Sequence, residues 1–353
     1  MTISKLIRDL SSRAGDWLKG SGTDADVVIS SRIRLARNLE GYPFLPRLEE
    51  EQALEIVRRL TAAVERSGAV PDPIICDLRD TPSLDRLLLV ERHLISRELA
   101  NGEEPRSVIF SRDEVLSLMI NEEDHLRIQV LRAGLELDEL MSKARSIDDR
   151  IEHEVRFSYS NRLGYLTSCP TNTGTGMRLS VMLHLPALVF SKEIERVFQA
   201  VSSMNLTVRG LYGEGTQATG DFYQVSNQVT LGKSEEDILD DVRRAVPRIV
   251  KAERDVRDAL LAESRTMIED KAWRALGTLR SARTIGSEES MEFLSIIRMG
   301  AYMGVLPNVE ISSVNELFLL VQPGHVQNLQ GRTLKAAERD RVRSELIRSR
   351  LGG

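Results

Sequence analysis

Three consecutive carboxylates at residues 122–124 (Glu-Glu-Asp) constrain the fold more than any other stretch of this chain. Residues 115–120 before them are mostly apolar, and residues 126–130 after them alternate between apolar and polar side chains. Alternation is typical of a half-buried strand, in which successive side chains point to opposite faces. Three neighbouring acids therefore cannot all lie on one core face. The pattern predicts two strands joined by an acidic bend with a carboxylate in a cleft; a solvated acidic turn is the alternative.

Strand and helix patterns alternate up to residue 230. Strands are expected at residues 27–38, 74–76, 107–110, 115–120, 126–130, 177–185, 206–210 and 222–230. Helices are expected at residues 49–67, 83–99, 136–155 and 192–204, and another begins at a capping box at Ser234. Beyond residue 250 helices follow one another, with starts at Ser287, Ser313 and Thr333. We expect an α/β domain at residues 1–254 and an all-α domain at residues 255–353.

Composition and charge exclude several classes of protein. The net charge of −5 argues against direct binding of nucleic acid. No run of about 18 apolar residues offers a membrane span. The first twenty residues lack the apolar region of a secretion signal, so a cytoplasmic location is expected. Cys76 and Cys169 lie too far apart for a metal knuckle, so both are expected to be thiols and no metal site built from side chains is expected.

Two arginines lie close together near the start of the chain. Arg32 and Arg34 are two residues apart on one predicted strand, so they project from the same face. Guanidinium groups bind phosphate oxygens bidentately, which makes the pair a candidate for holding a polyanion. A solvated strand edge, where basic residues are common, is the other interpretation of this pair.

A loop of small and hydroxyl residues, Ser-Cys-Pro-Thr-Asn-Thr-Gly-Thr-Gly, occupies residues 168–176. Its backbone N–H groups are suited to meeting an anion, although loops of this composition are common. The loop is not a Walker A sequence, because GxxxxGK[ST] occurs nowhere in the chain.

Cationic and acidic residues recur at comparable positions in several segments. Five arginines lie in predicted strands or at their ends: Arg32, Arg34, Arg127, Arg178 and Arg209. Glu122, Glu214 and Cys169 lie in neighbouring loops. Cations neutralise transferring phosphates and a carboxylate holds a cationic acceptor, so this set suits phosphoryl transfer from a nucleoside triphosphate to a cation.

Four stretches carry a resemblance to a known family: SSRIRLARN, NEEDHLRIQ, CPTNTGTGMRLSVMLHLP, and VRGLYGEGT followed by FYQVSN. In this order they resemble the catalytic domain of the ATP:guanido (phosphagen) kinases, and the resemblance covers residues 24–254. Within that family the chain is most similar to the bacterial protein-arginine kinases. The resemblance implies a largely antiparallel sheet flanked by helices, ATP and Mg²⁺ as cofactors, and phosphorylation of arginine side chains in proteins.

The resemblance also implies contacts for particular residues. The nucleotide would be bound by Ser30, Ser31, Arg32, Ile33, Arg34, His93, Arg127, Arg178, Leu179, Ser180, Val181, Met182, Arg209, Gly210, Leu211, Tyr212 and Gly213. The substrate guanidinium would be contacted by Glu122, Glu214 and Cys169. We expect Glu122 to accept a proton from the guanidinium and Glu214 to hold its other edge. The nearby cation would favour the thiolate of Cys169.

The chain departs from the small-molecule members of the family in two places. Those members begin with a helical domain of roughly a hundred residues that closes over the free guanidine, whereas here 26 residues precede Val27. An open site would admit an arginine that is part of a protein. Met182 stands where the relatives carry a histidine that stacks on adenine, and His93 is the candidate to pack there instead.

The resemblance further implies partners. Protein substrates would include a heat-shock repressor, and an activator protein and a Clp unfoldase would act with the kinase in marking proteins for Clp-type proteolysis. Apolar segments at residues 293–297 and 317–321 suggest a homodimer through the C-terminal helices, with a closed intramolecular bundle as the alternative. Two other functions stay open: a kinase of free arginine or another small guanidine, and an inactive phosphoarginine-binding module.

A last expectation concerns regulation in the final helix. Arg339 and Arg343 are i, i+4 neighbours on one helix face, and Asp340 and Ser344 form the adjacent pair. Two guanidinium groups suit a phosphate, and a carboxylate suits a guanidinium, so the four residues fit phosphoarginine. The protein-arginine kinases carry an allosteric phosphoarginine site in this sequence context. A solvated charged helix face is the alternative.

Overall fold

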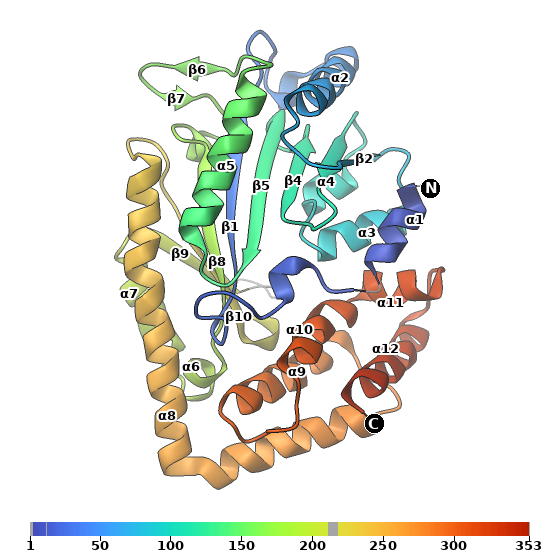
Figure 1. Ribbon diagram of the computed structural model, residues 1–353, viewed down its shortest axis with the longest axis vertical. Coiled ribbons are helices and arrows are strands. Elements are labelled where there is room, and N and C mark those ends of the chain that lie inside the picture. Colours follow the sequence, from blue (N-terminus) through green and yellow to red (C-terminus); the bar gives the residue numbers. More distant parts are fainter. Residues whose placement is uncertain (1–2, 12, 211–217, 353) are drawn as a thin grey trace.

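The computed structural model describes residues 3–11, 13–210 and 218–352. Within these ranges eight strands form one antiparallel sheet in the order β2-β3-β4-β5-β1-β8-β10-β9, at the centre of Figure 1. The sheet strands are β1 (Val28–Arg37), β2 (Ile74–Asp77), β3 (Ser107–Phe110), β4 (Leu116–Ile120), β5 (Leu126–Ala133), β8 (Met177–His184), β9 (Leu206–Gly210) and β10 (Phe222–Asn227). The two short strands β6 (Tyr159–Ser160) and β7 (Gly164–Tyr165) pair separately.

The two faces of the sheet have opposite character because side chains alternate along each strand. Ile33 and Leu35 of β1, Ile128 of β5 and Leu179 and Val181 of β8 enter the main core. Helices α2 (Glu50–Ser67), α5 (Leu137–Glu152), α7 (Ile194–Ser202) and the first half of α8 (Glu235–Ser281) cover this face. Figure 1 shows α5 lying along β1 and β5. The opposite face carries the predicted arginines.

Short helices lie around the remaining parts of the sheet. They are α1 (Ile3–Leu10), α3 (Ser83–Glu91), α4 (Arg97–Asn101) and α6 (Pro186–Phe190), with 3₁₀ turns at Asp16–Leu18, Leu45–Arg47, Pro170–Asn172 and Thr219–Asp221. Helices α1 and α3 pack on β2 and β3 in a smaller core that includes Ile7, Leu88 and Cys76. Burial raises the pKa of the Cys76 thiol to about 12, so this thiol is a neutral core residue.

Helix α8 connects the sheet to the C-terminal helices. It begins at the predicted capping box, where the Ser234 hydroxyl accepts from Asp237 N–H. Its backbone departs from helical geometry at Ser264 (φ −141°), and Figure 1 shows the helix bending before it passes beneath the C-terminal bundle. The predicted boundary at residue 254 falls inside α8, and the division into domains at that residue stays a prediction.

The C-terminal bundle consists of α9 (Ser287–Tyr302), α10 (Ile311–Leu320), α11 (Pro323–Gln330) and α12 (Ala336–Leu351) around the second half of α8. Leu317 and Phe318 are buried in a core that also takes in Trp17 and Met182. The apolar segments that suggested a homodimer are thus covered within one chain, as the intramolecular alternative predicted. Phe293 and Ile296 are half-buried, and the homodimer stays a prediction.

One predicted helix is wrong. The expected helix at residues 83–99 is two helices, α3 and α4, and the chain breaks between them. His93 adopts a left-handed conformation (φ 60°), and the preceding Arg92 is fully buried against Glu114. A left-handed residue ends a helix, so residues 92–96 form a turn instead. None of the helices in the described ranges combines the length and apolarity needed to cross a membrane.

Candidate active site

Neighbouring strands bring the predicted arginines together on the face opposite the main core. Arg32 and Arg34 of β1 share this face, as predicted from their spacing. The register places Arg34 directly opposite Arg178 of β8, and Arg127 of β5 lies opposite Ala36, the next β1 residue on that face. Like charges opposite one another in a sheet are destabilising. The arrangement therefore points to a bound anion that offsets the repulsion.

The electrostatics of Arg34 support the same conclusion. Burial, together with Arg32, Arg127 and Arg178, lowers the pKa of Arg34 well below its usual range. Burial and the neighbouring Arg209 and Arg127 also lower the pKa of Arg178. The Nε atoms of Arg34 and Arg178 are buried and have no hydrogen-bond partner among the described residues. A buried donor without a partner is costly, so both groups are suited to a ligand with oxygen acceptors.

Polar residues on β8 and β10 hold the arginine side chains in place. Arg32 donates through Nη2 to Gln224 Oε1 at 2.8 Å and through Nε to Ser180 Oγ at 3.3 Å. Arg178 donates through Nη2 to Ser226 Oγ at 3.0 Å. Neutral acceptors orient the guanidinium groups without neutralising their charge.

A cleft of about 1290 Å³ opens above this arginine-bearing face. One wall comes from the segment after α3 and includes Glu91, His93 and Ser96. Another part of the lining comes from the C-terminal bundle, with residues of α9 and the start of α11. The volume exceeds the roughly 300–1,000 Å³ of ordinary ligand pockets.

Glu122 lies in the acidic bend between β4 and β5 and is 5% exposed. Its Oε1 accepts from Arg127 Nη1 at 2.7 Å and from Ser96 Oγ at 2.6 Å. Its Oε2 is buried and has no partner among the described residues. Asn121, the preceding residue, is left-handed (φ 57°), which turns the chain sharply here. One oxygen of the carboxylate is thus fixed, and the other is available to a cationic ligand.

The other two acids of the bend differ from Glu122. Glu123 has a half-exposed side chain that contacts Arg127 Nη2 at 2.9 Å. Asp124 is fully buried, and its Oδ1 accepts from Asn38 Nδ2 at 2.6 Å and from Ser168 N–H at 2.7 Å. Asp124 therefore holds the loop that carries Cys169 against the acidic bend.

The Cys169 loop starts at this anchored position. Cys169 is partly exposed, and its Sγ lies 3.0 Å from Thr171 Oγ1. The loop returns to β8 through Gly176, which is left-handed (φ 64°). A Cβ atom at Gly176 would lie 2.6 Å from Ala36 O of β1, so the loop meets the arginine-bearing strand closely.

Comparisons with known proteins identify the family. A model described as the ATP:guanido phosphotransferase C-terminal catalytic domain matches residues 55–256, and the protein-arginine kinase McsB C-terminal domain matches residues 265–353. A protein-arginine kinase from Symbiobacterium thermophilum is 46% identical over 97% of this chain and 98% of its own length. One from Halalkalibacterium halodurans is 44% identical over 98% of both chains. The chain belongs to the protein-arginine kinase family.

Solved structures of other guanidino kinases are similar to this member of the family. A duplicated taurocyamine kinase from Schistosoma mansoni is 25% identical with a TM-score of 0.57, over 71% of this chain and 39% of its own. A lombricine kinase is 24% identical with a TM-score of 0.58, over 70% of this chain and 71% of its own, which shows the fold. The predicted family and fold class are confirmed, and the protein is a phosphotransferase.

The nucleotide residues predicted for this member of the protein-arginine kinase family fall into three groups. Arg32, Arg34, His93 and Arg127 line the cleft. The side chains of Ile33, Leu179 and Val181 lie in the main core on the opposite face of the sheet, so their predicted contact with the nucleotide stays a prediction for their backbone groups. Among the remaining residues, Ser30, Ser31 and Ser180 are buried, and Ser31 Oγ donates to Gly134 O. Met182 belongs to the core of the C-terminal bundle. Arg209 and Gly210 are the last two residues of β9.

Four predicted residues lie outside the described ranges: Leu211, Tyr212, Gly213 and Glu214.

His93 lines the cleft beside Arg32 and Arg34. Its ring lies 4.9 Å edge-on to Trp17, and its backbone oxygen accepts from Gln129 Nε2 at 2.7 Å. Burial and the charges of Arg32 and Arg34 lower its pKa to about 3, so His93 is neutral.

Sequence reasoning missed the residues that orient the site. Ser96, Gln224 and Asp124 each fix a functional group through one hydrogen bond. The pattern of Ser96 followed by Leu99 is that of a helix N-cap, and Ser96 Oγ does accept from Leu99 N–H. That signal predicts a helix start, but it does not reveal the contact with Glu122, which is 26 residues away.

The predicted phosphoarginine residues lie on α12. Arg343 is buried; its Nε donates to Val321 O at 2.7 Å, and its Nη1 donates to Ile285 O at 2.8 Å and Asp340 Oδ1 at 2.5 Å. Ser344 is buried and donates to Arg283 O. Arg339 is partly exposed. Part of the proposed ligand set thus holds the bundle together, and binding of phosphoarginine there stays a prediction.

Proposed function

We propose that the protein transfers the γ-phosphoryl group of ATP to a guanidino nitrogen of arginine side chains in proteins. The observation that carries the proposal is the proximity of two complementary groups. Arg32, Arg34 and Arg127 line the cleft, and the buried Glu122, bonded to Arg127, keeps one oxygen without a partner. The cations suit the phosphates of ATP, and the free oxygen suits a guanidinium.

The reaction breaks the bond between the γ-phosphorus and the β–γ bridging oxygen and forms a phosphorus–nitrogen bond. The attacking nitrogen loses one proton, and ADP leaves. The pKa of a guanidinium lies far above neutral pH, so its nitrogen has no usable lone pair until that proton is removed. Glu122 Oε2 is the acceptor we assign, because Arg127 and Ser96 hold the other oxygen of the carboxylate and leave Oε2 without a partner among the described residues. Alignment and charge neutralisation supply most of the rate.

Two further residues complete the proposed guanidinium site. Cys169 would contact the guanidinium from the loop that Asp124 anchors to the acidic bend. Glu214, which lies outside the described residues, holds the other edge of the planar group by the family resemblance. The arginine-bearing face, with Arg178 and Arg209 beside the cleft arginines, binds the phosphates.

Mg²⁺ would arrive with the nucleotide. No group of three or more His, Cys, Asp or Glu side chains suited to a metal ion occurs within the described ranges. Mg²⁺ keeps several waters and is often bound mainly through substrate phosphates. When bound, the ion would supply neutralisation of phosphate charge, and Arg32, Arg34 and Arg127 would bind phosphate oxygens beside it.

The protein substrate is supported by the relatives, which are protein-arginine kinases over nearly the whole of this chain. The test offers ATP with an arginine-rich unfolded protein and with free L-arginine in parallel. Acid-labile phosphate on the protein is expected. Phosphate on free arginine alone would make the chain a small-guanidine kinase, and no turnover of ATP with either acceptor would make it a binding module.

The role of Glu122 is tested by Glu122→Gln, with Glu123→Gln as the matched control. Both variants remove one negative charge next to Arg127. Loss of a catalytic base lowers kcat by about 10²-fold or more, so kcat of Glu122→Gln should fall by at least that factor. Glu123 is half-exposed, and its variant should stay within a few-fold of the parent chain. Equal losses in the two variants would remove the proton-acceptor role from Glu122.

The physiological roles that we propose rest on the family resemblance. They are marking of proteins for Clp-type proteolysis with a Clp unfoldase, inactivation of a heat-shock repressor, dependence on an activator protein, and a cytoplasmic location. Feedback by phosphoarginine at Arg339, Asp340, Arg343 and Ser344 belongs to the same set. For a homodimer, the half-exposed Met267 and Trp273 of α8 provide apolar surface, and light scattering at micromolar concentration tests it.

A further inference from the structure

The cleft above the arginine-bearing face has a wall from a part of the chain that the catalytic fold does not include. Ser287, Glu288, Met291 and Glu292 of α9 line it, together with Gln322 and Pro323 at the start of α11. We call these six residues the C-terminal wall. Its first residue, Ser287, lies 160 positions further along the chain than Arg127, the last of the cleft-lining arginines.

Buried contacts hold one end of this wall against the segment that carries His93. Glu91, at the end of α3, accepts from Gly324 N–H at 2.6 Å and from His325 N–H at 3.0 Å through its two oxygens. The His325 ring lies 2.7 Å from the same carboxylate and 3.2 Å from Arg92 Nη1. The start of α11 is therefore fixed next to His93, two residues after Glu91.

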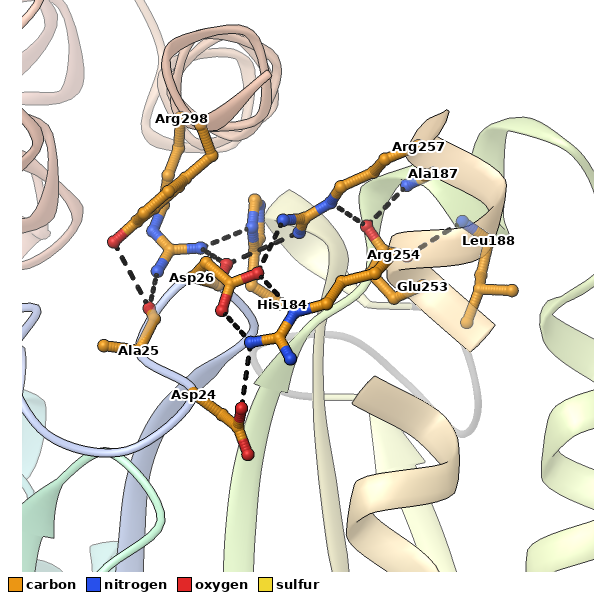
Figure 2. A network of polar contacts seen from close by, with 11 residues as sticks. Asp24, Ala25, Asp26, His184, Ala187, Leu188, Glu253, Arg254, Arg257 and Arg298 are labelled. Carbon is orange, nitrogen blue, oxygen red and sulfur yellow. Dashed lines mark hydrogen bonds and ion pairs between the residues drawn. The ribbon is translucent and has the colours of Figure 1, made fainter. Parts of the chain in front are cut away.

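A second buried network holds α9 against the sheet. Ser295 donates to Asp221 Oδ2 at 2.5 Å and lies 2.9 Å from His184 Nε2. Arg298, three residues on, contacts His184 Nδ1 at 2.8 Å and donates to Ala25 O at 2.7 Å. Figure 2 shows Arg298 and His184 meeting beside Asp26, and Arg257 and Glu253 of α8 next to them. Asp221 itself lines the cleft, so the wall is fixed at both ends.

The wall differs in chemistry from the arginine-bearing face. It contains no arginine or lysine, and two of its members, Glu288 and Glu292, are exposed carboxylates one helical turn apart. No ion pair or hydrogen bond from another described residue occupies either carboxylate. Met291 adds apolar surface beside Gln322, whose Nε2 donates to the Met291 sulfur at 3.3 Å. A triphosphate is repelled here, whereas a neutral ring and a ribose diol are suited to such a surface.

We propose that the C-terminal wall binds the adenosine half of ATP, so that one nucleotide bridges the catalytic domain and the C-terminal bundle. The inference rests on ATP as the phosphoryl donor. The triphosphate lies on the arginine-bearing face, and the base and ribose lie between His93 and α9. Glu288 and Glu292 accept from the ribose hydroxyls, a pairing that carboxylates make in other nucleotide sites. The C-terminal bundle is then part of the nucleotide site.

Hydrogen exchange on the unmodified full chain tests the bridge directly. The two probes are ATP and inorganic tripolyphosphate, which carries the phosphates without adenosine. ATP is expected to slow exchange in the peptide covering residues 287–292, and tripolyphosphate is expected to leave that peptide unchanged. Absence of protection by ATP, or equal protection by both probes, overturns the proposal.

A pair of variants on α9 provides the second test. Glu292→Trp places a large ring in the cleft, and Glu289→Trp places the same ring on an exposed position that does not line it. Measured by calorimetry, Glu292→Trp should weaken ATP binding at least tenfold and keep the affinity for tripolyphosphate within twofold of the parent. Glu289→Trp should bind both ligands as the parent does. If Glu292→Trp binds ATP as tightly as the parent, or loses affinity for ATP and tripolyphosphate equally, the proposal that the C-terminal wall binds adenosine is refuted. A parent chain that binds no ATP at all refutes the proposed function as well.

Discussion

Ser96 is expected to position the proposed base, and Ser96→Ala tests this. The hydroxyl makes two contacts: it donates to Glu122 Oε1 at 2.6 Å and accepts from Leu99 N–H at 3.0 Å as the N-cap of α4. A hydrogen bond to a charged group contributes about 1.5–3 kcal/mol, and loss of an N-cap costs about 1 kcal/mol of stability. Loss of the contact with Glu122 affects both turnover and stability, whereas loss of the N-cap affects stability only.

The contact with Glu122 acts on turnover. If Ser96→Ala lets the carboxylate rotate about its remaining bond to Arg127, a loss of 1.5–3 kcal/mol corresponds to a fall in kcat of about 10- to 150-fold. The KM for ATP should change little, because the arginines that line the cleft are untouched. The N-cap contact acts on thermal unfolding alone. Steady-state kinetics and a melting curve on the same preparation separate the two effects.

Ser96→Thr is the matched variant because it keeps the hydroxyl. It should restore most of kcat and of the melting temperature. The reasoning fails if Ser96→Ala melts at a lower temperature but turns over like the parent, since Arg127 alone would then hold Glu122. It also fails if Ser96→Thr is as slow as Ser96→Ala, because the added methyl group rather than the hydrogen bond would then decide activity.

Three further predictions concern the scaffold. Gly176→Ala should destabilise by about 2 kcal/mol more than Gly304→Ala, because both residues are left-handed but only Gly176 would bring a Cβ to 2.6 Å from Ala36 O; urea unfolding measures the difference, and equal costs would contradict it. Arg298→Met should cost about 3–5 kcal/mol by leaving buried acceptors unpaired, while Arg274→Met, at a side chain 79% exposed, should cost under about 0.5 kcal/mol. The free energy of unfolding should fall between pH 7.5 and 5.5, by up to about 1.4 kcal/mol per pH unit for each buried histidine. Each folded pKa lies below the unfolded value, so the unfolded chain binds more protons in this window; a flat profile would contradict burial of the neutral rings. The four histidines are His93, His125, His184 and His325.

Local patterns in the sequence were sufficient to place the arginines and the acidic bend. The alternation in residues 126–130 and the two-residue spacing of Arg32 and Arg34 depend only on the geometry of a strand. That geometry puts Ile33 and Leu179 in the core for the same reason that it puts Arg34 and Arg178 on the opposite face of the sheet. The nucleotide residues implied by the family resemblance include all of residues 30–34 and 178–182 and do not follow this alternation, so the side chains of Ile33, Leu179 and Val181 among them lie in the core.

The break between α3 and α4 depended on contacts from far along the chain. Residues 83–99 have the composition of one helix, but Arg92 is fully buried by Glu114, by the N-terminal segment and by His325 of the C-terminal bundle. These partners come from three different parts of the sequence, so a local pattern could not show them. The break is what brings His93 to the cleft and Ser96 to Glu122.

Strands β1 and β8 place repelling arginines on one face of the sheet and packed core residues on the other. Arg34 faces Arg178 across β1 and β8 with unpartnered donors on both, an arrangement that is unfavourable until an anion binds. On the other face of those strands Ile33, Leu35 and Leu179 are buried in the main core, which holds the backbone in register whether or not the site is occupied. Because the backbone is held in place, the arginines cannot move apart, and their repulsion is relieved when phosphate binds. That relief favours phosphate binding. The C-terminal wall extends this arrangement, because its buried anchors, Glu91 and Asp221, lie at the rim of the same cleft.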